Sequence, residues 1–148
     1  AALDKVSELV ADAVGKGATV LVGGQAPGGA GYFYPPTVIT GVPASAAMAR
    51  EEIFGPVAPL TPFSTEEEVI AAANDSEFGL VSYVFTNDLR RALRVGEALE
   101  SGMVGINQGI VSNPAAPFGG MKQSGLGREG GAVGIDEFLE TKYIGISM

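Results

Sequence analysis

Residues 57–107 read "VAPLTPFSTEEEVIAAANDSEFGLVSYVFTNDLRRALRVGEALESGMVGIN", and this stretch decides the fold. Three short apolar runs, "VAPLTPF", "LVSYVF" and "MVGIN", alternate with two segments whose apolar side chains recur at helical spacing. Strands and helices that alternate with short connections are typical of a parallel sheet covered by helices. The sequence therefore predicts an α/β fold with a parallel-type sheet and covering helices.

Start and stop signals support both helices of this stretch. Thr65-x-x-Glu68 is a capping box, in which the hydroxyl and the carboxylate each accept a hydrogen bond from a backbone N–H of the first turn. Thr86 or Asn87 is expected to cap the second helix, and Gly102 is expected to end it.

The same analysis extends to both sides. Before the stretch, apolar spacing over residues 3–14 predicts an amphipathic helix, and "ATVLVGG" and "TVIT" predict two strands. After it, a short helix is expected near residues 132–139, and "KYIGISM" is expected to form a terminal strand. Residues 108–130 form a long loop without periodicity. A loop of that length at the carboxyl end of a parallel strand is typical of a ligand site.

Composition narrows the classes of function. With 148 residues, of which 46% are hydrophobic, the chain is long enough for one domain or one piece of a larger domain. The net charge of -8 repels phosphate backbones, so we expect no nucleic-acid partner. No apolar run approaches the roughly 20 residues that a membrane span needs, and the first residues are not signal-like. We therefore expect a cytoplasmic protein without a membrane partner.

Two residue types are missing from the sequence. It contains no cysteine and no histidine, so the chain cannot by itself supply a Cys/His zinc site, a Ser-His-Asp triad, a thiolate nucleophile or an imidazole base. No catalytic residue and no metal ligand is predicted within it.

The motif "REEIFGPV", at residues 50–57, has two interpretations. A solvated charge run followed by an ordinary Gly-Pro turn accounts for it structurally. Alternatively, a carboxylate beside an aromatic ring can accept hydrogen bonds from the two hydroxyls of a ribose, while the ring packs on a flat heterocycle.

A second motif is Gly125-x-Gly127-x-x-Gly130, which has the glycine spacing of a dinucleotide-binding loop. One hypothesis is therefore an independent dinucleotide-binding domain. However, such a loop follows directly on a hydrophobic strand, and "GGMKQS" precedes the first glycine here. We assign no ligand to the flanking Lys122 and Arg128, because solvated charges are the common fate of such loop residues.

Five segments of the chain resemble the carboxyl-terminal part of the NAD(P)-dependent aldehyde dehydrogenase superfamily in their order and separations. They are "EEIFGPVAPL", "ANDSEFGL", "VFTNDLRRALRV", "GMVGIN" and "PFGGMKQSGLGRE". The longer run "GINQGIVSNPAAPFGGMKQSGLGREG" most resembles the succinate-semialdehyde dehydrogenase branch. The resemblance implies that residues 1–148 form the carboxyl-terminal portion of the catalytic domain. It also implies that the cofactor domain is absent and that about residues 140–148 form an oligomerisation strand.

The resemblance also implies roles for four residues. Glu52 matches the carboxylate that holds the nicotinamide-side ribose, and Phe54 matches the ring that limits where the nicotinamide lies. Ser112 falls where the succinate-semialdehyde branch holds the distal carboxylate of its substrate, and Phe118 matches an aromatic residue of the aldehyde tunnel. From the residues alone, Ser112 can instead be a loop serine bonded to its own backbone and Phe118 a core side chain.

Enzymes of this family attack the aldehyde with a cysteine thiolate, transfer hydride to nicotinamide and hydrolyse the thioester with water. By resemblance, the full-length protein oxidises succinate semialdehyde to succinate with NAD or NADP and forms a homo-oligomer. This chain lacks the nucleophile and is expected to be inactive without the remainder of the enzyme. Two alternatives stay open: a dehydrogenase for another aliphatic aldehyde or semialdehyde, and a non-catalytic assembly module built on the terminal strand.

Overall fold

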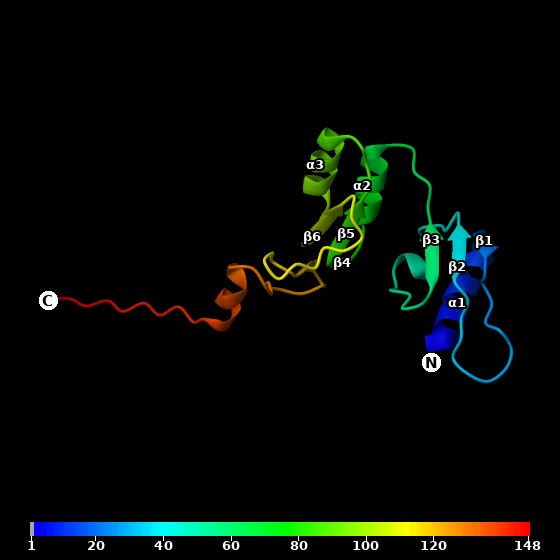
Figure 1. The fold of residues 1–148 in the computed structure, drawn as a ribbon, viewed down its shortest axis with the longest axis horizontal. Helices are drawn as coiled ribbons and strands as arrows, with labels where there is room; N and C mark the ends of the chain where they lie inside the picture. The colour runs from blue at the N-terminus through cyan, green and yellow to red at the C-terminus, as the bar shows by residue number, and fades with distance from the viewer. Residues whose placement is uncertain (1) are drawn as a thin grey trace. The chain divides into compact units, whose positions relative to one another are not determined.

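The computed structural model describes residues 2–148, and the chain divides into two compact units (Figure 1). Unit 1 is Ala1–Phe63 and contains one α-helix and a three-stranded sheet; unit 2 is Ser64–Met148 and contains two α-helices and two short sheets. None of the helices described is long and apolar enough to cross a membrane.

Unit 1 starts with helix α1 (Ala2–Gly15), followed by strands β1 (Thr19–Val22), β2 (Thr37–Thr40) and β3 (Val57–Leu60). The strand order is β1-β2-β3. β1 pairs with β2 in antiparallel orientation, whereas β2 and β3 are parallel, with Thr37 beside Val57 and Thr40 beside Leu60.

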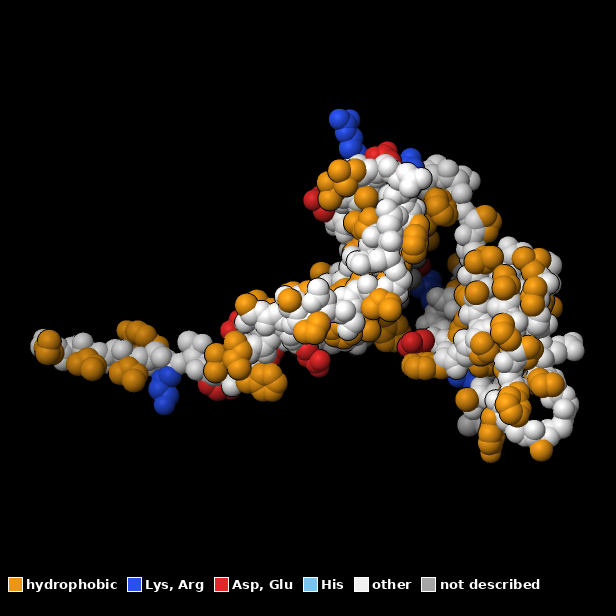
Figure 2. Space-filling view, in the orientation of Figure 1, with side chains coloured by type: hydrophobic (Ala, Val, Ile, Leu, Met, Phe, Trp, Pro, Cys, Tyr) orange, Lys and Arg blue, Asp and Glu red, His pale blue; other side chains and the backbone are white. Residues whose placement is uncertain are grey.

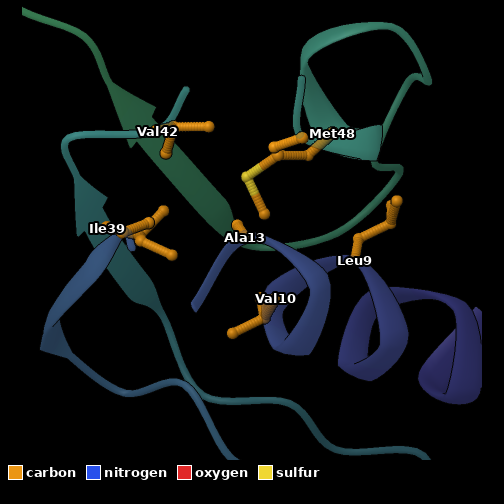
Figure 3. Close-up of a cluster of buried hydrophobic side chains, with 8 residues drawn as sticks. Leu9, Val10, Ala13, Ile39, Val42 and Met48 are labelled. Carbon is orange, nitrogen blue, oxygen red and sulfur yellow. The ribbon is translucent and has the colours of Figure 1, made fainter. Parts of the chain in front are cut away.

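The core of unit 1 lies between α1 and the sheet (Figure 3). The four buried side chains of α1, at positions 6, 9, 10 and 13, have the spacing of a single helix face. The core cluster consists of Leu9, Val10, Ala13, Ala18, Ile39, Val42, Ala46 and Met48. Because each fully buried Val, Leu or Ile side chain contributes about 1.5–3 kcal/mol, this cluster stabilises the packing of the helix on the sheet.

Unit 2 is organised around a strand–helix–strand unit. β5 (Val81–Val84) and β6 (Met103–Ile106) are parallel, and helix α3 (Leu89–Ala98) connects them. Helix α2 (Glu66–Asn74) precedes a second sheet, in which β4 (Phe78–Gly79) pairs antiparallel with β7 (Met121–Lys122). A 3-10 helix, η2 (Val133–Phe138), follows.

The predicted start of α2 is confirmed, whereas the predicted cap of α3 is wrong. Thr65 accepts a hydrogen bond from the Glu68 N–H, which closes the first half of the capping box. The cap of α3 is Asp88, whose carboxylate accepts hydrogen bonds from the backbone N–H groups of Arg90 and Arg91. Thr86 instead accepts from the Asp88 N–H, so it orients the cap rather than forming it. α3 also ends at Ala98, before the expected glycine stop.

The fold class is α/β, as predicted, but the strands form three separate sheets rather than one parallel-type sheet. β3 pairs with β2 in unit 1, and β5 and β6 form a sheet of their own in unit 2. Parallel pairing occurs in both of these pairs, whereas β1 and the β4–β7 pair are antiparallel. Periodicity along the chain predicts the order of the elements. It does not predict which strands share hydrogen bonds, because distant contacts decide that.

The carboxyl-terminal region differs most from the prediction. The expected helix near residues 132–139 is a six-residue 3-10 helix. The expected terminal strand does not form in this single chain: residues 140–148 have no regular secondary structure and are exposed. A strand needs a paired neighbour to be stable, and no segment within residues 2–148 pairs with this one.

Many large apolar side chains are exposed on both units (Figure 2). The most exposed aromatic ones are Tyr32, Phe33, Phe54, Phe85, Phe138 and Tyr143. Exposed apolar surface on this scale is typical of regions that contact another protein segment.

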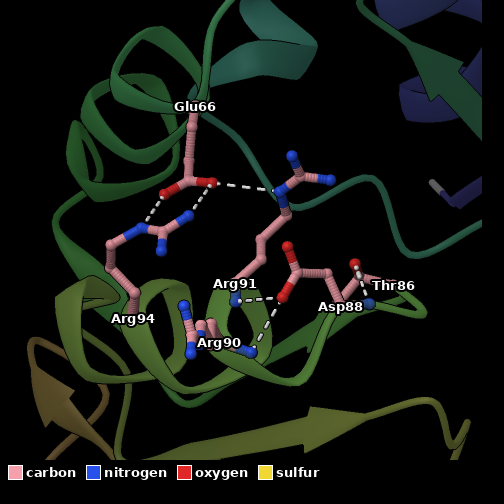
Figure 4. A network of polar contacts seen from close by, with 6 residues as sticks. All are labelled: Glu66, Thr86, Asp88, Arg90, Arg91 and Arg94. Carbon is pink, nitrogen blue, oxygen red and sulfur yellow. Dashed lines mark hydrogen bonds and ion pairs between the residues drawn. The ribbon is translucent and has the colours of Figure 1, made fainter.

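Glu66 joins α2 to α3 through a network of ion pairs (Figure 4). Its carboxylate accepts hydrogen bonds from two guanidinium groups, those of Arg91 and Arg94. The hydrogen bond from Arg94 holds the pKa of Glu66 below its ordinary value, against a smaller effect of desolvation, and Arg91 adds to the lowering. The network therefore favours the ionised form of Glu66.

We expect this network to make unit 2 less stable in acid. A carboxyl group with a lowered pKa stabilises the folded state above its unfolded value of 4.5, and this contribution is lost as the pH falls through the folded value. The melting temperature of Glu66→Gln should lie below that of the wild type at pH 7 and approach it in acid, as followed by circular dichroism. Arg94→Met should behave similarly. Arg90→Met is the control, because the Arg90 side chain makes no bond to Glu66 in Figure 4. A difference between Glu66→Gln and the wild type that does not change with pH would contradict the assignment.

Candidate functional site

Glu52 and Phe54 lie in unit 1, between a short 3-10 helix, η1 (Ala47–Ala49), and β3. The ammonium group of Lys5, in α1, donates a hydrogen bond to the Glu52 carbonyl oxygen at 2.7 Å, so the segment is attached to that helix. The Glu52 side chain is exposed. Within residues 2–148, no hydrogen bond or ion pair engages its carboxylate. The carboxylate is thus available to a ligand.

Phe54 has a backbone conformation that is rare for an aromatic residue. Its φ is 48°, in the left-handed region, and its side chain is 76% exposed. Residues held in such sparsely populated conformations cluster at ligand sites, and this exposed ring is not stabilised by burial. An exposed ring in this conformation is compatible with a binding segment at residues 50–57, which stays a prediction.

Ser112 and Phe118 lie in unit 2, in the segment after β6, which we call the β6 loop (residues 108–121, the last of which is the first residue of β7). Asn107 precedes the loop with a left-handed φ of 54°. Its side-chain amide accepts a hydrogen bond from the Thr86 N–H and donates one to the Thr86 carbonyl oxygen, each at 2.8 Å. These two bonds extend the contact between β5 and β6 by one residue and fix the start of the loop.

Ser112 is not bonded to its own backbone and Phe118 is not a core side chain, so neither structural alternative applies. The Ser112 side chain is exposed, and its hydroxyl makes no hydrogen bond within the described part of the chain. The neighbouring Asn113 side chain accepts the local backbone bond instead, from the Ala115 N–H. Phe118 is 36% exposed, so it is not a core residue of unit 2, and its backbone exchanges two hydrogen bonds of 2.7 Å with Glu129.

Two glycines allow the β6 loop to pack closely on the rest of unit 2. A Cβ atom at Gly102 would lie 2.0 Å from the Gly119 carbonyl oxygen, and one at Gly119 would lie 2.6 Å from the Gly127 carbonyl oxygen. No side chain fits at either position. Gly102 and Gly119, the first glycine of "PFGG", therefore serve close contact between backbone segments.

Lys122 is not the solvated loop charge that the sequence suggests. Its ammonium group donates hydrogen bonds to the carbonyl oxygens of Asn74 (2.7 Å) and Ser76 (3.1 Å), and it lies 2.6 Å from the Glu100 carboxylate. The prediction was wrong because the end of α2 leaves carbonyl groups that need donors. The available signal was the absence of any basic residue in the last turn of α2.

The three-glycine motif does not have the geometry of a phosphate cradle. β7 has only two residues, and a turn separates it from Gly125. The N–H of Arg128 already donates to the Glu137 carboxylate at 3.2 Å, and the Arg128 guanidinium binds the carbonyl oxygens of Gly120 and Gly127. Since a carboxylate occupies an N–H that a phosphate would need, the structure disfavours an independent dinucleotide-binding domain.

The four predicted residues therefore form two pairs, one in each unit. Each pair lies within one segment at exposed positions, and Phe54 itself has a left-handed backbone. A pocket in unit 1 lies between α1 and residues 20–26, and none of the four residues lines it. Among the described residues, no three or more Asp or Glu side chains are grouped so that they could hold a metal ion. Neither pair includes a cysteine or a histidine, and a ligand site at these residues stays a prediction.

Known proteins match nearly the whole chain. Succinate-semialdehyde dehydrogenase of Paenarthrobacter nicotinovorans is 56% identical over 146 residues, which cover 99% of this chain and 32% of that protein. Glutarate-semialdehyde dehydrogenase of Pseudomonas putida is 56% identical over 147 residues, with coverages of 99% and 30%. The crystal structure of an NADP-dependent enzyme of Escherichia coli is similar with a TM-score of 0.93 at 56% identity, and covers 99% of this chain and 31% of that one.

The chain thus spans about a third of the length of these relatives. The model of the aldehyde dehydrogenase family matches residues 1–144. Because this match includes both candidate segments and all but the last four residues, the chain belongs to the aldehyde dehydrogenase family.

Proposed function

We propose that this chain is the carboxyl-terminal portion of the catalytic domain of a dehydrogenase that oxidises succinate semialdehyde to succinate. The identity of 56% to a succinate-semialdehyde dehydrogenase over 99% of the chain supports this function. The observation that carries the substrate assignment is the exposed Ser112 hydroxyl, which has no hydrogen-bond partner within residues 2–148. In this role, Ser112 donates a hydrogen bond to the distal carboxylate of the substrate.

The cofactor of the proposed reaction is NAD or NADP, whose nicotinamide accepts the hydride of the aldehyde when bound. The Glu52 carboxylate fits such a group, because it is exposed and has no bond within the described residues. It accepts hydrogen bonds from the ribose hydroxyls on the nicotinamide side. Phe54, exposed and held in the left-handed conformation, limits where the nicotinamide ring lies.

Phe118 provides an apolar wall for the carbon chain of the aldehyde, and its paired backbone with Glu129 holds it in place. The same arrangement suits glutarate semialdehyde, which also carries a terminal carboxylate. The Pseudomonas putida relative of that name makes it the second candidate substrate. Ser112 has the same role for both substrates.

The remainder of the enzyme chain completes the site in this proposal. The sequence has neither the cysteine nor a histidine to act as nucleophile or base, so we expect no oxidation of aldehydes by this chain alone. Residues 140–148 form an oligomerisation strand in a homo-oligomer. The exposed Tyr143, Ile144 and Ile146 support this role, since they would be covered by a paired strand. A cytoplasmic location belongs to the same proposal.

The substrate assignment can be tested with Ser112→Ala in the full-length enzyme. Loss of one hydrogen bond to a carboxylate should lower kcat/KM for succinate semialdehyde, mainly by raising KM. The expected loss corresponds to roughly 1.5–3 kcal/mol of binding free energy. Butanal, a neutral aldehyde of the same length, should be affected much less. Ser112→Thr keeps a hydroxyl and serves as the control. Equal losses with both aldehydes would refute the carboxylate role of Ser112.

The cofactor assignment can be tested with Glu52→Gln. The amide has only one acceptor oxygen and no charge, so we expect weaker cofactor binding and slower turnover, by about tenfold in kcat/KM for the cofactor. Steady-state kinetics with NAD and with NADP measure this. Glu51→Gln changes the adjacent exposed carboxylate and should have little effect. Unchanged kinetics of Glu52→Gln with both cofactors would rule out a ribose contact.

A further inference from the structure

Both ends of the β6 loop adjoin a residue in the left-handed conformation that is not glycine. Asn107 precedes the loop and Lys122 follows it, each with a φ of 54°. Among residues 2–148, Phe54 is the only other residue of this kind. Because such conformations are unfavourable for residues with side chains, each needs compensating contacts. The side chain of Asn107 bonds to Thr86 at the end of the neighbouring strand, whereas that of Lys122 bonds to the end of a helix.

Lys122 supplies what the end of α2 lacks. Helix α2 begins with three glutamates and has no basic residue in its last turn, so its C-terminal carbonyl groups have no cation from the helix itself. The Lys122 ammonium binds the carbonyl oxygens of Asn74 and Ser76, 48 and 46 residues away in sequence. Its side chain is only 25% exposed, which limits screening by solvent. The lysine therefore connects the end of the β6 loop to the end of α2.

Backbone bonds strengthen this connection. β7 pairs Lys122 with Phe78 and Met121 with Gly79, and the Gln123 N–H donates to the Glu77 carbonyl oxygen. Phe118 is four residues before Lys122 in the same segment. The place of its ring relative to the rest of unit 2 thus depends on the Lys122 end of the segment as well as on the backbone bonds to Glu129.

We propose that Lys122 is a positioning residue for aldehyde selectivity: through its bonds to the end of α2, it fixes the β6 loop so that Ser112 and Phe118 meet the substrate. This inference rests on the proposed function of those two residues. Lys122 does not touch the reacting atoms. Its loss therefore affects the KM of a carboxylate-bearing aldehyde more than the kcat.

The test compares three variants of the full-length enzyme. Lys122→Met keeps a side chain of similar length on the same strained backbone but removes the hydrogen-bond donors. Lys122→Arg keeps a cation with several donors. Glu100→Gln removes only the ion pair with a half-exposed carboxylate and leaves both carbonyl bonds. Lys122→Gln, which keeps one donor group, replaces the methionine variant if that variant does not fold.

Hydrogen–deuterium exchange of residues 116–124 reads the positioning directly. We expect roughly tenfold faster exchange in Lys122→Met and rates close to the wild type in Lys122→Arg and Glu100→Gln. Steady-state kinetics should show a drop of about fivefold in the preference for succinate semialdehyde over butanal in Lys122→Met, carried by KM.

The two readouts separate two kinds of failure. Unchanged exchange in Lys122→Met would overturn the positioning role, whatever the kinetics. Faster exchange with unchanged selectivity would support the role of Lys122 in attaching the loop to α2. It would overturn the substrate role of the β6 loop, and with it the proposed function of Ser112. If Glu100→Gln exchanged as fast as Lys122→Met, the ion pair rather than the two carbonyl bonds would hold the loop, which would overturn this part of the proposal.

Discussion

The close approach of backbone at Gly102 and Gly119 is the constraint on which the candidate substrate segment depends. A Cβ atom at Gly102 would lie 2.0 Å from the Gly119 carbonyl oxygen, so the two segments can meet only without a side chain there. This contact places the β6 loop against the residues that lead into β6. Lys122 can then reach the end of α2, and Phe118 can pair with Glu129.

Both candidate ligand segments combine an exposed side chain with a backbone that neighbouring elements hold in place. Phe54 adopts a left-handed conformation beside Glu52, whose carbonyl oxygen is bound by Lys5. The β6 loop is held by Asn107 at one end and by Lys122 at the other. A non-glycine residue in this conformation costs of the order of 1–3 kcal/mol, which the supporting hydrogen bonds offset. Segments held in this way would need little ordering on binding a ligand, as the proposed function requires.

The order of helices and strands could be predicted from the sequence because it depends on local patterns. The apolar face of α1 and the capping box at Thr65 are examples. Asp88 was missed as a cap, because three consecutive residues could each serve and only the backbone geometry selects one. The terminal strand was predicted from its composition, but a strand forms only where a partner strand is present.

The candidate site residues were found by resemblance, whereas their supports were not. Lys122 and Arg128 look like loop charges in the sequence, because the carbonyl groups that they bind come from other segments. The left-handed conformation of Phe54 also has no sequence signal, since aromatic residues rarely adopt it, whereas asparagine at position 107 is a residue type that does. Such features arise from tertiary contacts and became visible only in the folded chain.

The most direct test of the account is a crystal structure of the full-length enzyme with NADP and succinate bound. The account predicts the Glu52 carboxylate within about 3 Å of the hydroxyls of the nicotinamide-side ribose, and the Ser112 hydroxyl at a similar distance from a succinate carboxylate. A ribose held by other residues, with Ser112 directed away from the ligand, would contradict it.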